Sequence, residues 1–140
     1  MTIPDRRTIL LVLTFTVIGA AVFAVHQMIA HPVPMKPGVP SLVLGANISR
    51  WTIGILGLIG LIGGYLTRAP APTVGCSLWI LLPLVTIYEL VFVPASTYEH
   101  NLFPIEFAFQ LVLAFPAILG AWLGRRLAEW RDTRRAGSAG

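Results

Sequence analysis

The sequence predicts an all-α protein, a bundle of four transmembrane helices with both termini on the cytoplasmic side. Three observations lead to this prediction. Of the 140 residues, 56% are hydrophobic and only 11% are charged, and the mean hydropathy is +0.78, whereas a soluble domain is about 45–50% apolar and roughly 25% charged. The apolar residues form four long runs separated by proline-containing connectors. The basic residues collect on one side of the path that these runs imply.

Four apolar runs account for most of the chain. A helix that crosses a bilayer needs about 20 predominantly apolar residues, and the second run is short of this length unless it begins before Arg50. The expected helices cover residues 8–30, 51–66 (or 42–66), 74–94 and 103–124, and a basic tail follows at 125–140. The chain length suits a single integral membrane domain, residues 1–140.

The connectors between the runs contain residues that end helices. "HPVPMKPGVPS" holds four prolines, "TRAPAPT" holds two, and "PASTYEHN" begins with Pro94. Proline cannot continue a helix interior without the loss of a backbone hydrogen bond, so each connector separates two helices. Two further prolines, Pro83 and Pro116, lie inside the third and fourth runs. There we expect kinks that neighbouring helices accommodate.

The distribution of arginine and lysine predicts the orientation. Cytoplasmic segments of membrane proteins carry an excess of basic residues. With the N-terminus inside, eight basic residues fall on the cytoplasmic side and two, Lys36 and Arg50, fall outside. Both termini are therefore expected in the cytoplasm. The eight are Arg6, Arg7, Arg68, Arg125, Arg126, Arg131, Arg134 and Arg135.

A second interpretation of the N-terminus stays open. A basic start followed by an apolar run that ends in "VFA" also resembles a signal peptide cleaved after Ala24. The apolar run is longer than the roughly 7–15 residues usual in such peptides, and cleavage would leave three crossings. We therefore expect the first run to remain as a membrane anchor.

Glycines are concentrated where helices could pack closely. Helices in a bilayer associate through small residues that allow their backbones to approach. The second run places glycines at a spacing of three residues and contains a GxxxG pair, and a second such pair ends the fourth run. Whether within the bundle or between subunits, the expected packing positions are Gly54, Gly57, Gly60, Gly64, Gly120 and Gly124.

Polar residues from all four runs are expected at one depth. In the predicted orientation, the external end of each helix carries a hydrogen-bonding or charged residue about 5–8 Å below the outer surface. We expect these side chains to form a polar pocket in which Glu89 and Glu106 face Arg50 and His26. Neighbouring positions extend the candidate set, which comprises His26, Arg50, Glu89, Glu106, His100 and Gln110.

Three roles for this pocket remain open from the sequence. Arg50 could pair with Glu89 or Glu106 and fix the helix register, since charged groups at membrane depth face the bundle interior. Alternatively, His26, Glu89 and Glu106 could bind a divalent metal, because imidazoles and carboxylates are common metal ligands. The two glutamates could also carry protons in a transporter or a membrane enzyme. The sequence specifies no cofactor.

The segment "STYEHNLFPIEF" resembles a segment of small bacterial four-helix membrane proteins of no established activity. The matching residues are His100, Asn101, Leu102, Phe103, Pro104 and Glu106. The resemblance implies the four-helix fold and a role for the external loop, and it implies no catalytic activity.

The sequence also argues against several functional classes. It contains no nucleophile elbow, phosphate loop, CxxC or haem-attachment motif, and no aromatic-basic pattern typical of nucleic-acid binding. We therefore expect no autonomous enzyme and no nucleic-acid partner. The expected function is that of an accessory or assembly subunit in a bacterial inner or plasma membrane, which acts through contacts with lipid, other subunits or itself. A small ion-, metal- or solute-handling protein is the alternative.

Overall fold

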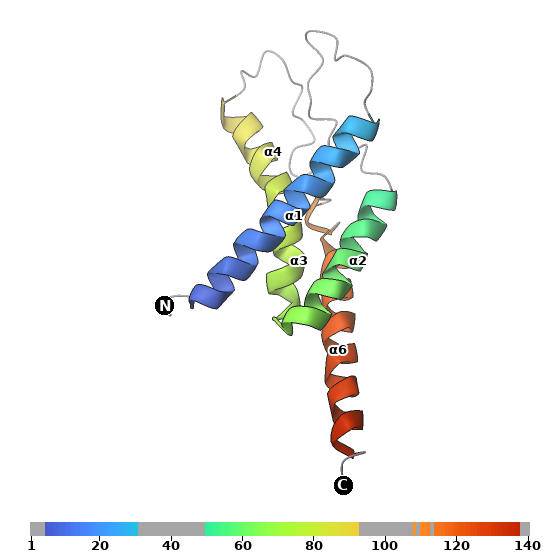
Figure 1. The fold of residues 1–140 in the computed structure, drawn as a ribbon. Coiled ribbons are helices and arrows are strands. Elements are labelled where there is room, and N and C mark those ends of the chain that lie inside the picture. Colours follow the sequence, from blue (N-terminus) through green and yellow to red (C-terminus); the bar gives the residue numbers. More distant parts are fainter. Residues whose placement is uncertain (1–4, 31–49, 93–107, 109, 113, 138–140) are drawn as a thin grey trace.

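The computed structural model describes residues 5–30, 50–92, 108, 110–112 and 114–137, and nearly all of them are helical. The prediction of an all-α chain is confirmed for this part of the sequence, where no strand occurs. The start of the second helix before Arg50 and the connectors around it lie outside the described residues. The helices are α1 (Arg6–Ala30), α2 (Arg50–Thr67), α3 (Ala71–Trp79), α4 (Leu81–Phe92) and α6 (Phe115–Gly137), shown in Figure 1.

Two helical segments are long and apolar enough to cross a membrane. They are Arg6–His26, which belongs to α1, and Gln110–Gly137, which includes α6. The apolar part of α2, Trp51–Thr67, is shorter. Among the described residues, length and composition therefore identify two candidate spans, where the sequence suggests four.

The third run contains two helices instead of the single helix expected over residues 74–94. α3 ends at Trp79, a turn follows at Ile80, and α4 begins at Leu81. Pro83 explains the interruption, because its ring displaces the carbonyl four residues earlier, which belongs to Trp79. The helix also begins earlier than expected, at Ala71, since prolines are tolerated in the first turn of a helix.

The fourth run shows the same effect of proline. Two residues before Pro116, the Ala114 amide donates to the Leu111 carbonyl at 3.2 Å, and a new helix begins at Phe115. This proline therefore marks a helix boundary, where the sequence suggested a kink within one helix.

α6 continues well beyond the expected end at Gly124. The helix runs to Gly137 and includes most of the segment expected as a basic tail at 125–140. No proline or glycine interrupts it between these two glycines. Arginines in its last turn, Arg134 and Arg135, interact favourably with the negative end of the helix dipole.

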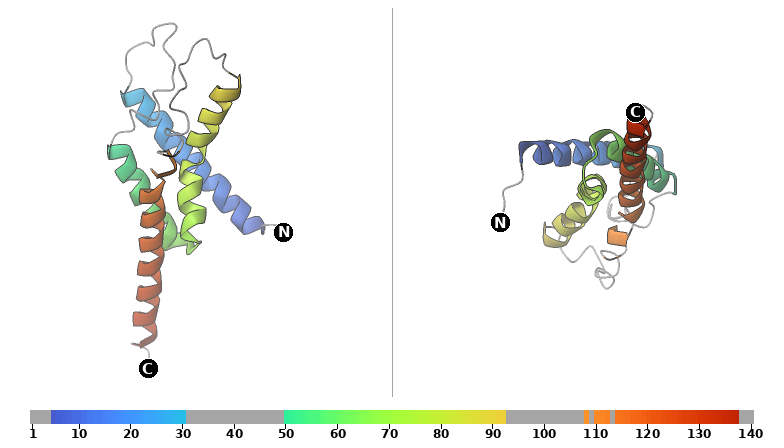
Figure 2. Two further views of the ribbon diagram at one scale, coloured as in Figure 1. Left: turned by 180° about the vertical axis from the view of Figure 1, so that it is seen from behind. Right: turned by 90° about the horizontal axis from the view of Figure 1, so that it is seen from below.

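α2, α3 and α6 form the packed part of the molecule. α2 lies along α6 in the most extensive contact between any two described helices, and α3 packs against both α6 and α1 (Figures 1 and 2). Leu56, Val74 and Leu78 are fully buried in the core. The rings of Phe23 and Trp79 form a T-shaped pair, with centroids 5.2 Å apart, which joins α1 to this core.

The directions of the helices follow from their neighbours. Gly63 faces Phe15, and Thr52 bonds to His26, so α1 and α2 run antiparallel. α2 and α6 run parallel, because Gly120 faces Gly57 while Gly124, further along, faces Leu61. The start of α1, the α2–α3 turn and the end of α6 therefore share one end of the molecule (Figure 1).

We call the end of the molecule that holds the start of α1, the α2–α3 turn and the end of α6 the basic end. The residues described there include eight arginines and three carboxylates, a net charge of +5. They are Asp5, Arg6, Arg7, Arg68, Arg125, Arg126, Glu129, Arg131, Asp132, Arg134 and Arg135.

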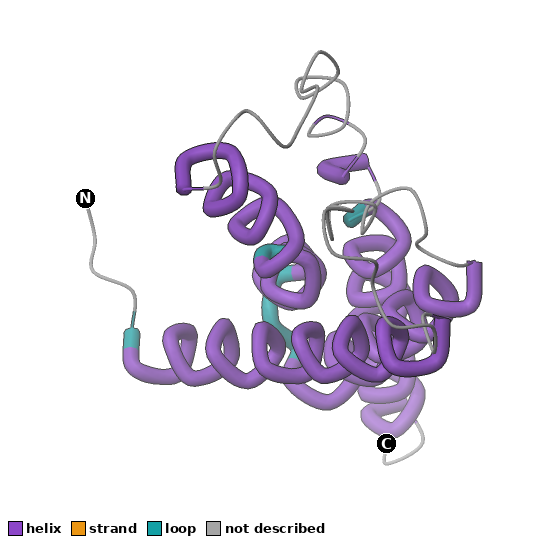
Figure 3. Tube along the Cα trace, turned by 90° about the horizontal axis from the view of Figure 1, so that it is seen from above, coloured by secondary structure: helices purple, strands orange, loops and turns teal. Residues whose placement is uncertain are grey.

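α1 and α4 diverge from the packed helices. Viewed along the bundle, α1 lies across one side and α4 leans away from it (Figures 2 and 3). Large apolar side chains on both helices are exposed, among them Leu13, Val17, Leu84 and Val91. We call α1 and α4 the arms, and α2, α3 and α6 the core, although α2 and α6 also expose large apolar side chains such as Leu58 and Phe115.

Candidate functional site

Four glycines bring α2 and α6 into backbone contact. They are Gly60 and Gly64 on α2, and Gly120 and Gly124 on α6. A Cβ atom at any of them would lie within 3.0 Å of a backbone carbonyl oxygen of the other helix, closer than real Cβ atoms approach. We call these four residues the glycine seam. No larger residue fits there without a shift of the backbone.

The other two expected packing glycines are less constrained. A Cβ at Gly57 would lie 3.5 Å from the Pro116 carbonyl oxygen, which is ordinary contact. At Gly54, no described atom lies within 4 Å of the added Cβ, so this glycine lies outside the seam. Of the glycines on α2 that the sequence singled out for packing, only Gly60 and Gly64 are thus required by the close contact with α6.

The facing surface of α6 is a stripe of small residues. Its buried members are Ala117, Gly120, Ala121, Gly124 and Ala128. Gly120 and Ala121 are adjacent, and the other intervals are three or four residues, so all five lie on one face of the helix. Small side chains on this face allow the close approach that the glycine seam shows.

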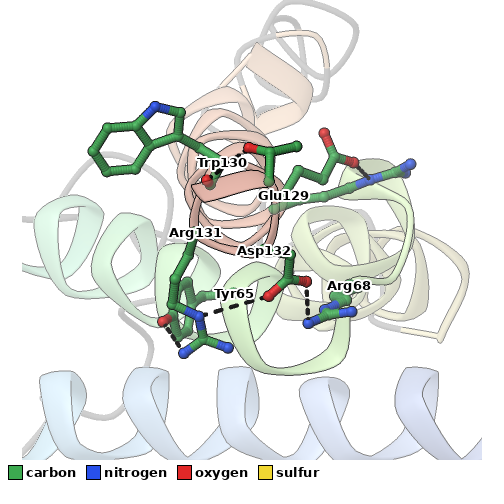
Figure 4. A network of polar contacts seen from close by, with 8 residues as sticks. Tyr65, Arg68, Glu129, Trp130, Arg131 and Asp132 are labelled. Atoms are coloured by element: carbon green, nitrogen blue, oxygen red, sulfur yellow. Dashed lines mark hydrogen bonds and ion pairs between the residues drawn. The ribbon is translucent and has the colours of Figure 1, made fainter. Parts of the chain in front are cut away.

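At the basic end, a network of charged and aromatic side chains joins α2 to α6 (Figure 4). Arg131 donates from Nη1 to the hydroxyl oxygen of Tyr65 at 2.5 Å, and its guanidinium lies 5.0 Å from the centre of the same ring. Arg68 pairs with Asp132 at 2.5 Å, and Arg131 lies 3.7 Å from that carboxylate. The network continues the glycine seam in the same direction along both helices.

The backbone at Arg68 has a positive φ of 54°. This left-handed conformation commonly ends a helix but is unfavourable for a residue other than glycine or asparagine. The Arg68 amide donates to the Gly64 carbonyl at 3.0 Å, and the Ala69 amide donates to Thr67 Oγ1 at 3.2 Å. These bonds, with the ion pair to Asp132, hold the strained turn in place.

A surface groove lies beside this turn. Its volume is about 360 Å³, and its lining comes from the start of α3 and from α6. The lining residues are Pro70, Ala71, Pro72, Trp122, Arg125, Arg126 and Glu129. The groove thus combines two cationic side chains, one carboxylate, an aromatic ring and two prolines at the basic end.

The structure describes part of the polar pocket expected at the opposite end. His26 Nδ1 lies 2.9 Å from Thr52 Oγ1, in hydrogen-bond contact between α1 and α2. Thr52 and Gln110 are both buried. The structure thus gives His26 a threonine partner that the sequence did not single out.

The charged members of the expected pocket are not described. Arg50 and Glu89 occupy helical positions in α2 and α4, but their side chains lie outside the described set. His100 and Glu106 lie outside the described residues altogether. Among the residues that are described, no three His, Cys, Asp or Glu side chains form a metal-binding group. The metal site proposed for His26, Glu89 and Glu106 therefore stays a prediction.

The sequence did not anticipate the network at the basic end. The arginines indicate orientation and the aromatic residues suggest membrane-interface positions, but neither pattern pairs Tyr65 with a residue 66 positions away. One local signal was available, since Arg125 and Glu129 are four residues apart and form an ion pair of 2.9 Å on one helix face.

Comparison of the chain with protein-family models, with curated proteins and with solved structures yields no match. The function must therefore be argued from the geometry of the chain itself.

Proposed function

We propose that the chain is a multi-pass membrane protein with four spans, the basic end in the cytoplasm, and that it acts as an accessory or assembly subunit. The observation that carries this proposal is the exposure of large apolar side chains on the arms, α1 and α4, which extend away from the packed helices. Their apolar faces are available to helices of another protein. A bacterial inner or plasma membrane is the expected location.

The helix directions support a four-span arrangement. α1 and α2 are antiparallel, and α2 and α6 are parallel, as required if the odd-numbered spans leave the cytoplasm and the even-numbered spans return. The division of the third run at Ile80 makes α3 and α4 the two halves of one crossing. Eight arginines at one end agree with the excess of basic residues on cytoplasmic segments.

The exposure of α1 supports a role in helix–helix contacts. The most apolar stretch of α1, within Arg6–His26, has a mean hydropathy of 2.5, but only 17% of this stretch is buried within the chain. Lipid alone can cover such a helix, but exposed side chains of α1 and α4, such as Val17 and Val91, also suit contact with a helix of another protein. Since the glycine seam is occupied internally, a partner would meet larger side chains such as Leu13 and Val17.

A polar-ligand function is the second candidate, favoured by the contact between His26 and Thr52 and by the burial of Gln110. Buried polar groups at membrane depth commonly mark a path or a binding site. In this alternative, Arg50, Glu89 and Glu106 complete a pocket for an ion, a metal or a small solute.

Photo-crosslinking in the native host tests the first proposal. A photoreactive residue replaces Leu13 or Val17 on α1, or Val91 on α4, and Leu58 on α2 serves as an exposed control away from the arms. We expect a partner protein of one size to crosslink from the arms and to co-purify stoichiometrically in mild detergent. A homogeneous species that carries metal or solute, with no crosslinked partner, supports the second candidate instead.

Reporter fusions test the orientation. Fusions after Gly140 and within residues 33–40 should report opposite compartments. The same compartment for both fusions would contradict the four-span arrangement.

A further inference from the structure

We propose that the groove at the basic end binds the phosphate group of an anionic phospholipid. This inference rests on the proposed membrane location and adds a ligand to it. The ligand class follows from the groove's charge, its walls and the surface that leads into it.

The groove's charge favours an anion. Arg125 lies 2.9 Å from Glu129, and Arg126 lies 3.5 Å from the other oxygen of the same carboxylate. Two guanidinium groups therefore share one carboxylate, and each keeps hydrogen-bond donors for a second anion. All three side chains are at least 43% exposed, so exchange of their contacts for a phosphate requires little desolvation.

The opposite wall of the groove is the start of α3. Prolines occupy two of its positions, Pro70 and Pro72, and they place apolar rings beside the guanidinium groups. No acidic residue lies in the first turn of α3, and no side chain caps it. The positive end of the helix dipole therefore adds to the field of the arginines at this wall.

An apolar stripe on α6 leads into the groove, and it identifies the anion as a lipid. Phe115, Leu119 and Trp122 are exposed, and their spacing of four and three residues places them on one helix face. Arg126 lies four residues further on the same face and sits over Trp122 at 5.7 Å. A single helix face thus changes from apolar to aromatic to cationic.

The length of this stripe matches one leaflet. From Phe115 to Arg126 the helix rises about 16 Å, close to half of the roughly 30 Å hydrocarbon thickness of a bilayer. An acyl chain can lie along Phe115 and Leu119 while the phosphate meets Arg125 and Arg126. A free phosphate ion or a nucleotide would use the groove but not the stripe.

Native mass spectrometry of the full-length protein, released from nanodiscs of mixed phosphatidylglycerol and phosphatidylcholine, tests this inference. We expect the wild type to retain phosphatidylglycerol preferentially. In the double variant Arg125→Gln/Arg126→Gln, retention should fall by about tenfold or more, since each basic residue near an anionic surface contributes appreciably to lipid attraction. The matched control is Arg134→Gln/Arg135→Gln, which removes the same charge from the same helix outside the groove and should retain the lipid.

Three outcomes would overturn the inference. Equal losses in both double variants would show a diffuse attraction to the basic end. Competition by millimolar inorganic phosphate, with no dependence on acyl chains, would assign the groove to a free anion. A wild type that retains no lipid would refute the site directly. Carbonate extraction keeps this test separate from the membrane proposal, because a protein that stays in the membrane without selective lipid retention contradicts only the lipid site.

Discussion

Two segments, Arg6–His26 in α1 and Gln110–Gly137, which includes α6, are long and apolar enough to cross a membrane, yet they are buried to different extents. The most apolar stretch of Arg6–His26 has a mean hydropathy of 2.5, and only 17% of it is buried. The corresponding stretch of Gln110–Gly137 has a mean hydropathy of 1.4, and 35% of it is buried. In a soluble protein the more apolar helix would be expected inside. Here the order is reversed.

In these two helices, burial corresponds to small residue size better than to hydrophobicity. α6 presents alanines and glycines to α2, whereas much of the surface of α1 consists of large apolar side chains. This order is expected where lipid surrounds the helices, because burial of leucine against another helix then gains little over burial in lipid. In the membrane location proposed above, close backbone contact would be the main source of stability.

The largest effect is expected from a variant that disrupts the close contact between α2 and α6. Gly64→Ala places a Cβ against the backbone of Ala121, and we expect a loss of roughly 1–3 kcal/mol from overpacking. Gly54→Ala is the matched control on the same helix, where no described atom meets the Cβ. There the better helix propensity of alanine should stabilise by about 0.5–1 kcal/mol.

Unfolding in detergent, followed by circular dichroism, measures both variants. Opposite signs for the two alanines support the glycine seam. Equal effects would mean that α2 and α6 do not approach as closely as the geometry indicates.

The attachment of α1 can be tested in the same way. Gly19→Ala would bring a Cβ into the Leu78 carbonyl of α3. We expect a smaller loss, near the lower end of the same roughly 1–3 kcal/mol range, because α1 has few other contacts and can move away. The Phe23–Trp79 ring contact should weaken, which the tryptophan fluorescence reports. If the spectrum is unchanged, α1 is held more firmly than its open position suggests.

The network at the basic end should contribute less than the seam. Tyr65→Phe removes the hydroxyl that accepts from Arg131 but keeps the ring beneath the guanidinium. Tyr65→Leu removes both. We expect losses of about 0.5–1 kcal/mol for the first and a further 0.5–1 kcal/mol for the second, measured by the same unfolding experiment. No difference between the two variants would exclude a cation–π contribution.

The smallest expected effect concerns the first turn of α1. The Thr8 amide donates to Asp5 Oδ1 at 2.8 Å, and hydrogen bonds from Thr8 hold the pKa of this aspartate below its ordinary value of 3.8, with a smaller contribution from Arg7. Because the folded pKa is the lower one, the stabilisation is present above pH 3.8 and is lost as the pH falls through the folded pKa.

Hydrogen exchange of the Thr8 amide, corrected for its intrinsic rate, should therefore lose protection in this acidic range. Asp5→Asn keeps a capping group without a charge, and its protection should not change over the same range. Acid-dependent exchange in the asparagine variant would assign the effect to another group.

Much of the helical organisation could be predicted from the sequence, because long apolar runs and prolines act locally. The position of each interruption could not. Pro83 was expected to bend a helix, but the chain makes a turn at Ile80 and starts again. Whether a proline bends or ends a helix depends on whether neighbouring groups satisfy the freed backbone, and these neighbours are distant in the sequence.

The candidate site shows the same limit. GxxxG spacing indicates the residues of the seam, yet only the fold shows that Gly54 faces open space while Gly60 faces a carbonyl. The pairs Tyr65–Arg131 and Arg68–Asp132 join residues more than sixty positions apart, and no local pattern in the sequence links the two members of either pair. Glu89 and Glu106 first suggested a pocket, but Glu106 lies outside the described residues and the side chain of Glu89 is not described.

The unbroken course of α6 has a mechanical consequence. From Gly124 to Gly137 the helix extends about 20 Å beyond the seam, and the Tyr65–Arg131 contact fixes its rotation about its own axis. Whatever binds to its last turn is thereby held at a set distance and a set angle from the core. One inserted residue between Gly124 and Arg131 would rotate the rest of the helix by about 100°. The helix can therefore set both the distance and the orientation of a group bound at its end.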